Sequence, residues 1–147
     1  MGWTANYSYF GMTGHVEMTS SFMTATVSDY GMLTTNPNFA QTGVFHMAVT
    51  GATSLFNYGD HGPNKYSTTA NAMFFYAEQF SHPEFALFQR YRVDAAEPWS
   101  MFLYDPTMSG GFWDGYPLDQ YFNPSIDQWA AMRSSWTGFD ALYCTSQ

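Results

Sequence analysis

The stretch Tyr58-Gly59-Asp60-His61-Gly62-Pro63-Asn64-Lys65-Tyr66 opens the most regular helical pattern in the chain. Its two glycines permit backbone angles that other residues avoid, and Pro63 fixes φ near the value found at a helix start. Apolar residues then recur at helical spacing as far as Phe80. The pattern predicts a buried helix over 66–80 with a rigid polar turn at its start. Such a turn is either a binding site or a well-made structural corner.

The composition is unusual for an isolated soluble domain. The 147 residues are long enough for one domain with a real core, yet only 11% are charged and 20% are aromatic. A surface of hydroxyl, amide and aromatic side chains suits neutral polar ligands such as sugars, or contact with further protein. The four Lys and Arg residues against twelve acidic ones give a net charge of −8. Nucleic-acid binding is therefore disfavoured, because no basic stripe can replace the counterions.

Cysteine content and hydropathy give no sign of a disulfide, a membrane span or a secretory signal. Cys144 is the single cysteine, so no intrachain disulfide can form. No apolar run is long enough to cross a bilayer, and the N-terminus lacks the basic start and apolar middle of a secretory signal. We expect no membrane partner.

Three further helices are predicted. One spans 12–27, and a second spans 39–49 between the cap-like Asn36-Pro37-Asn38 and Gly51. The third begins at Ser81 and Glu84, a pair spaced as in a capping box, and carries Phe85, Phe88 and Arg92 on one side. We expect His46 to be packed in the interior and His82 to face solvent.

The remainder of the chain changes character. Four prolines and a Gly-Gly pair over 94–125 predict a long ordered loop or a set of short turns. Residues 131–136 alternate as a strand does, and a turn at 137–140 can lead into a second strand over 141–144. One hairpin is marginal in water. We expect it to need a larger sheet, which this chain does not supply.

Four ordered blocks resemble the heparinase II/III-like family of polysaccharide lyases. They are Trp3–Met18 (WTANYSYFGMTGHVEM), Tyr58–Tyr66, Ala96–Met101 (AEPWSM) and Asp127–Trp136 (DQWAAMRSSW). The family fold is an (α/α) toroid followed by an antiparallel β-sandwich. The resemblance implies a mainly α chain, with helical hairpins from an incomplete (α/α) toroid, a long loop region and a short C-terminal β-hairpin. The expected domains are 1–126 for the partial toroid and 127–147 for the first strands of a truncated β-sandwich, whose entry strand is 132–136.

The family cleaves uronic-acid-containing glycans by β-elimination. This reaction needs a group that neutralises the carboxylate, a base for the C5 proton and an acid for the leaving oxygen. Tyrosine can be the base or the acid where its surroundings lower the pKa from about 10. The resemblance implies Tyr7 as the catalytic residue, with Tyr9 second. The alternative is that both are ordinary aromatic residues at a helix start.

The resemblance also implies a substrate groove, with catalytic competence incomplete in this chain. The candidate groove residues are Trp3, Asn6, His15, Asp60, His61 and Lys65. His15 can equally be a packed or surface histidine, and Asp60 with Lys65 can be a local ion pair that braces the turn. The family's neutralising Asn or Asn-His pair and its sheet-domain His have no counterpart here. We therefore expect little activity from this chain alone. Catalytic groups that act as a unit lose most of their rate enhancement when any one of them is missing.

The expected partners are an acidic polysaccharide or oligosaccharide and the missing remainder of a parent protein, with an extracellular or secreted location by resemblance. No cofactor is expected, and the scattered histidines lack the short spacing of a metal site. One alternative is a non-catalytic carbohydrate-binding or interaction module that uses exposed aromatic residues. Another is a partly folded remnant without a function.

Overall fold

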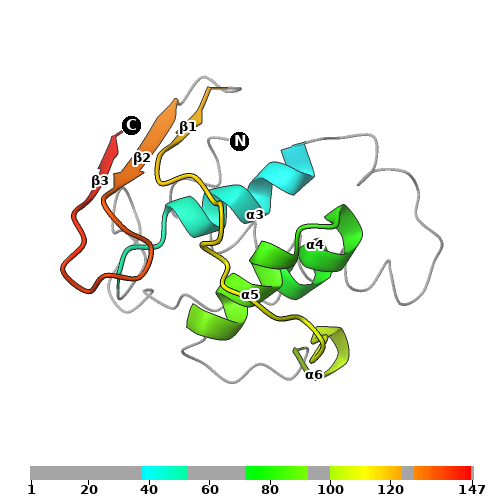
Figure 1. Ribbon diagram of the computed structural model, residues 1–147. Coiled ribbons are helices and arrows are strands. Elements are labelled where there is room, and N and C mark those ends of the chain that lie inside the picture. The colour runs from blue at the N-terminus through cyan, green and yellow to red at the C-terminus, as the bar shows by residue number, and fades with distance from the viewer. Residues whose placement is uncertain (1–37, 53–71, 93–99, 124–127, 147) are drawn as a thin grey trace, which may run out of the picture.

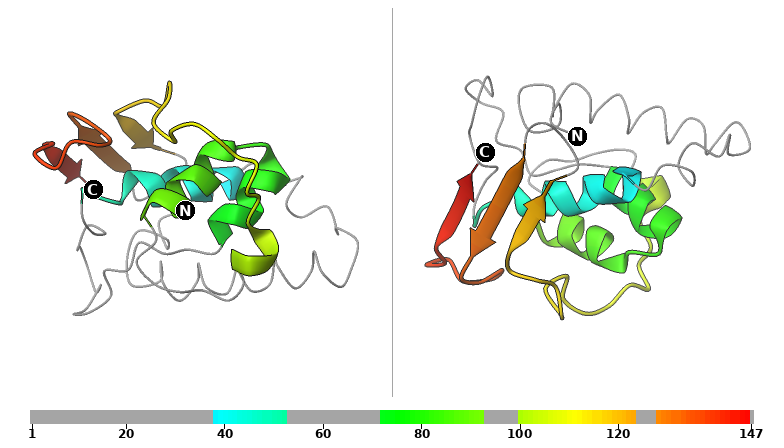
Figure 2. Two further views of the ribbon diagram at one scale, coloured as in Figure 1. Left: turned by 60° about the horizontal axis from the view of Figure 1, so that its bottom comes forward. Right: turned by 90° about the horizontal axis from the view of Figure 1, so that it is seen from above.

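The computed structural model describes residues 38–52, 72–92, 100–123 and 128–146 (Figure 1). The helices and strands follow in chain order: α3 (Asn38–Ala48), α4 (Ala72–Phe80), α5 (Pro83–Arg92), α6 (Ser100–Leu103), β1 (Gln120–Phe122), β2 (Trp129–Arg133) and β3 (Tyr143–Ser146). α3 contributes side chains to two hydrophobic clusters, one shared with α4 and α5 and the other with the sheet. It therefore lies between the helices and the strands (Figure 2).

The expected fold class is wrong. In place of helical hairpins from an incomplete (α/α) toroid with one short β-hairpin, the described residues form four short helices and a three-stranded antiparallel sheet. The unpredicted strand is β1, in the stretch over 94–125 that the sequence predicts to be loop. β1 has only three residues, too few to show an alternating pattern, and it is held by pairing with β2. The C-terminal hairpin thus has a third strand from the chain itself.

The sheet has one inner and one outer face. β2 is central, with Tyr121 of β1 opposite Ala130 and Cys144 of β3 opposite Met132. Alternate residues along β2 are buried, from Trp129 to Arg133, while Met132 is exposed. The inner face packs on α3, where the ring of Phe45 lies 5.5 Å from that of Trp129 and 5.3 Å from that of Phe122.

Three helices agree with their predicted ranges where these can be compared. α3 begins and ends within one residue of the predicted span 39–49. α4 covers the end of the helix predicted over 66–80, whose first residues lie outside the described ranges. α5 is the predicted third helix. The helix predicted over 12–27 also lies outside these ranges, and its prediction is untested.

The junction between α4 and α5 differs from the predicted capping box. Ser81 has a positive φ of 58°, and the amide of His82 donates to the carbonyl of Ala77 at 2.9 Å, which is the bond that closes a Schellman motif. Ser81 therefore ends α4. Glu84 is engaged elsewhere: its carboxylate lies 2.6 Å from Nδ1 of His82, whose side chain is 42% exposed and stacked on Phe85.

A close contact joins α3 to α5. A Cβ atom on Gly43 would lie 2.6 Å from the ring of Phe85, which is fully buried. Glycine is thus required where these two helices approach each other. His46 of α3 is 2% exposed, as predicted, and packs edge-on against Phe88 of α5.

The segment 104–119 forms ordered turns, as the sequence predicts. Asp105 accepts from the amide and hydroxyl of Thr107, and Asp114 accepts from the amide of Gly111 at 3.0 Å. Within the second turn Phe112 is inserted into the core, with its ring centre 5.0 Å from that of Phe88. The segment therefore covers the helices instead of projecting into solvent.

Candidate functional site

None of the predicted site residues falls within the ranges that the structure describes. These residues are Tyr7, Tyr9, Trp3, Asn6, His15, Asp60, His61 and Lys65. Their roles remain predictions. Of the four family-like blocks, the structure describes only the last two residues of Ala96–Met101 and all but the first of Asp127–Trp136. The site that can be built from geometry therefore starts from β2.

Arg133, the last residue of β2, is placed against the C-terminal end of α3. Its position on the inner face of the sheet leaves it 8% exposed. The guanidinium donates to the carbonyls of Thr50 at 3.1 Å, Ala48 at 2.8 Å and Met47 at 3.4 Å. The final carbonyls of a helix have no intrahelical partner and carry the negative end of the helix dipole. Arg133 therefore caps α3 from a strand more than eighty residues later in the chain.

Two aromatic rings enclose the same guanidinium. Its central carbon lies 3.6 Å from the ring centre of Trp136 and 4.8 Å from that of Tyr143, distances at which a cation is attracted by a ring face. The hydroxyl of Tyr143 donates to the carbonyl of Ala48 at 2.5 Å. Burial raises the pKa of Tyr143 above its ordinary value. Its phenol is thus a neutral donor, not a proton acceptor, near pH 7.

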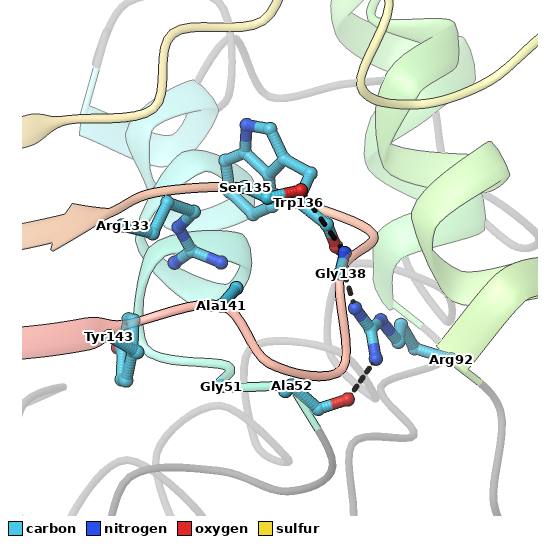
Figure 3. Close-up of a pocket in the computed structure, with 9 residues that line it drawn as sticks. All are labelled: Gly51, Ala52, Arg92, Arg133, Ser135, Trp136, Gly138, Ala141 and Tyr143. Atoms are coloured by element: carbon cyan, nitrogen blue, oxygen red, sulfur yellow. Dashed lines mark hydrogen bonds between the residues drawn. The ribbon is translucent and has the colours of Figure 1, made fainter.

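The charge on Arg133 persists at neutral pH. Burial, with a smaller contribution from the nearby positive charge of Arg92, lowers the pKa of Arg133 to about 10. Burial also lowers the pKa of Arg92, the last residue of α5. The Arg92 guanidinium donates to the carbonyl of Ala52 and, at 2.9 Å, to that of Trp136 (Figure 3). Two of the four Lys and Arg residues of this acidic chain therefore meet at one place.

A small pocket opens between these two arginines and the loop from β2 to β3. It is lined by residues from the end of α3, from α5 and from the hairpin: Gly51, Ala52, Arg92, Arg133, Ser135, Trp136, Gly138, Ala141 and Tyr143 (Figure 3). The room inside is about that of one water molecule. The lining offers cationic donors and aromatic faces, and no side chain in it is a base or nucleophile with a suitable pKa. The pocket can therefore bind a small hydrogen-bond acceptor, but it has no side chain suited to proton transfer.

The loop from β2 to β3 is held in shape by Ser135. Its hydroxyl oxygen accepts from the amides of Thr137 and Gly138, both at 3.1 Å, while the amide of Ser134 donates to the carbonyl of Leu142 at 3.0 Å. Trp136 leaves the strand here and donates from Nε1 to the carbonyl of Pro117 at 3.3 Å. The pocket rim is therefore ordered by local bonds within the hairpin and by the bond from Trp136 to Pro117.

The sequence reasoning missed Arg92, Arg133 and Tyr143 as site residues, although a signal exists for both arginines. Arg92 follows Phe85 and Phe88 on one side of its helix, and Arg133 shares a strand face with Ala131. A cationic side chain on an otherwise apolar face is buried with that face and needs hydrogen-bond acceptors or an opposite charge there. No comparable signal marks Tyr143, because tyrosines are abundant in the chain.

Other classes of site find no support in the described ranges. No group of three or more His, Cys, Asp or Glu side chains could hold a metal ion there. Nor does any of the helices in those ranges have the length and apolarity needed to span a membrane.

No family model, curated protein or solved structure matches the chain. Family membership and function therefore have to be argued from the residues and their geometry.

Proposed function

We propose that this chain is a polypeptide of the heparinase II/III-like lyase type that binds acidic, uronic-acid-containing glycans, with little or no turnover when it is tested alone. The observation that carries the proposal is the order of the four family-like blocks along the sequence. The block Asp127–Trp136 supplies the central strand of an antiparallel sheet, and the resemblance implies a strand within this block. That agreement supports the proposal independently of the expected toroid, which is wrong.

The proposed chemistry is β-elimination with Tyr7 as the proton-transfer residue. Abstraction of a proton next to a carboxylate is difficult unless the negative charge is offset, so a tyrosine alone supplies one part of the site. Among the three functional groups that the resemblance implies, this sequence offers a match for the tyrosine only. We therefore expect the chain to bind uronate oligosaccharides and to turn them over slowly or not at all when tested alone.

The test combines calorimetric binding with the absorbance of unsaturated uronate products, using the full chain and oligosaccharides from alginate and heparan. The proposal predicts binding to at least one acidic oligosaccharide, and any turnover should be lost in Tyr7→Phe without loss of binding. Tyr9→Phe tests the second candidate, and Tyr121→Phe serves as the matched control, because Tyr121 is an exposed tyrosine of β1 outside the candidate site. Absence of binding to every uronate oligosaccharide would contradict the proposal. Rapid turnover would contradict the expected lack of activity.

A second candidate function is non-catalytic carbohydrate binding, which one surface feature favours. Tyr91 on α5 is 60% exposed and its ring lies 5.1 Å from that of Trp113, with the two rings nearly perpendicular. Exposed aromatic rings with polar edges can stack on sugars. Under this alternative, neutral oligosaccharides bind as well as acidic ones, and Tyr91→Ala abolishes binding while Tyr7→Phe does not.

A further inference from the structure

We infer that the pocket between Arg92 and Arg133 binds one small monovalent anion, either chloride or a single carboxylate such as formate. The inference concerns only residues at the junction of α3, α5 and the β2–β3 loop. It does not depend on the proposed action on glycans, since a free anion of this size needs no sugar attached.

The first step is the incomplete compensation of Arg133. All of its hydrogen-bond acceptors are neutral backbone carbonyls, and its remaining contacts are two ring faces. Its Nε is buried without a hydrogen-bond partner, and in the described ranges no carboxylate lies within ion-pair distance of it. Asp119 attracts the charge from farther away, but this attraction is weaker than the repulsion from Arg92. A buried charge is costly unless it is paired. The end of α3 supplies only the equivalent of about half a negative charge.

The second step is the presence of another cation in the same pocket. Arg92 reaches into the lining from α5, and its charge acts unfavourably on Arg133. Two like charges in a partly buried space repel each other more strongly than they do in water. An anion between the two arginines would reduce that repulsion. It would also offset the part of the Arg133 charge that the end of α3 does not balance.

The third step is the size of the space and the donors around it. The room is about that of one water molecule, so only the smallest anions are candidates and bulky ones such as gluconate are excluded. Ser135 also lines the pocket, and its oxygen already accepts two backbone amides. Because a hydroxyl has one proton to donate, that proton remains for an acceptor placed in the pocket. Guanidinium and hydroxyl donors together form a site for an anion and not for a cation.

The experiment measures thermal unfolding of the full chain at constant ionic strength, with sodium gluconate replaced stepwise by sodium chloride or sodium formate. Formate and gluconate carry the same charged group and differ in bulk, so the comparison isolates the size of the pocket. We expect a saturable rise in the unfolding temperature with chloride or formate. At ten times the dissociation constant, the folded-to-unfolded ratio should rise about elevenfold.

Two variants make the test specific. Arg92→Met should weaken the anion response about tenfold or more, because one charged donor is lost. Arg90→Met removes the same charge from the same helix, and Arg90 donates to the carbonyl of Met108 at an exposed position outside the pocket. It should keep the wild-type response.

A direct measurement keeps the inference testable if Arg92→Met does not fold. Broadening of the chloride-35 resonance by the folded wild-type protein, reversed by formate and not by gluconate, is expected. The inference is overturned if chloride and formate act no differently from gluconate on the wild type. It is also overturned if Arg90→Met loses the response as fully as Arg92→Met.

Discussion

The two sides of α3 are stabilised in different ways. Toward α4 and α5 the contacts are among buried aromatic and aliphatic side chains such as Phe85 and Phe88. Toward the sheet, Phe45 also packs on Trp129, but at the C-terminal end of α3 the contacts centre on the guanidinium of Arg133 and the hydroxyl of Tyr143. Packing depends on filled volume, whereas a buried cation depends on the direction of each hydrogen bond. The two sides should therefore respond differently to substitutions that preserve shape and to those that preserve charge.

The largest effect is expected on the apolar side. Phe88 is 1% exposed and its ring meets Phe112 edge-on, so Phe88→Ala should destabilise the protein by about 4 kcal/mol through the cavity it leaves. Chemical denaturation measures the change. Met101→Ala is the control, because Met101 is a large apolar side chain that is 83% exposed and should cost less than about 0.5 kcal/mol. Equal losses for the two variants would show that the cluster around Phe88 is not a core.

At the C-terminal end of α3, a side chain that matches only the shape of Arg133 should not preserve stability. Arg133→Met keeps much of the side-chain volume but leaves the carbonyls at the end of α3 without their donor, so we expect a loss of about 3 kcal/mol. Arg133→Lys should recover little of it, because an ammonium lacks the planar fork that reaches two carbonyls at once. Denaturation curves of both variants provide the comparison. Full stability of Arg133→Met would mean that the cap contributes nothing.

A smaller effect is expected where α3 and α5 approach most closely. Gly43→Ala places a methyl group against the buried ring of Phe85, and overpacking of about 1–3 kcal/mol outweighs the gain of about 1 kcal/mol in helix propensity. The net expectation is a destabilisation of about 1 kcal/mol. Gln41→Ala, at an exposed position of the same helix, should be neutral or slightly stabilising. A more stable Gly43→Ala variant would show that the ring can move aside.

The smallest effect concerns the hydroxyl of Tyr143. Tyr143→Phe removes its bond to the carbonyl of Ala48 and should cost about 1 kcal/mol near pH 7. Burial raises the pKa of this tyrosine in the folded state, so its contribution is complete below pH 10 and is lost as the pH rises toward the folded-state pKa. Above pH 10 the wild type should therefore lose up to about 1.4 kcal/mol more per pH unit than the variant. Parallel stability–pH curves would contradict this assignment.

The local patterns predict the helices better than they predict the strands. α3 and α5 are readable because their apolar spacing lies within the segments themselves, although the capping box expected at the start of α5 is not formed. The hairpin is predicted at 131–136 and 141–144, but its strands are found two to three residues away, at 129–133 and 143–146. Trp136 explains the shift, because it leaves the strand to join the helical core. The packing of Trp136 against the helices joins segments that are distant in the sequence, so no local pattern predicts it.

The pocket, too, depends on contacts between segments that are distant in the sequence. Arginine on an apolar face is visible in the sequence, but its acceptors on α3 precede Arg133 by more than eighty residues. The expected toroid fails for a related reason. The blocks that suggest it are short and local, whereas the sheet depends on β1, a strand of three residues that is defined only by its pairing.

The central claim is that Arg133 joins the sheet to the end of α3, so that helices and strands open together. Native-state hydrogen exchange of amides in α3, α5 and β2 tests it most directly, because it gives an opening free energy for each element. We expect one shared opening free energy for α3, α5 and β2 in the wild type. In Arg133→Met, the β2 amides should open at lower free energy than those of α5. Separate opening free energies for β2 and α3 in the wild type would contradict it.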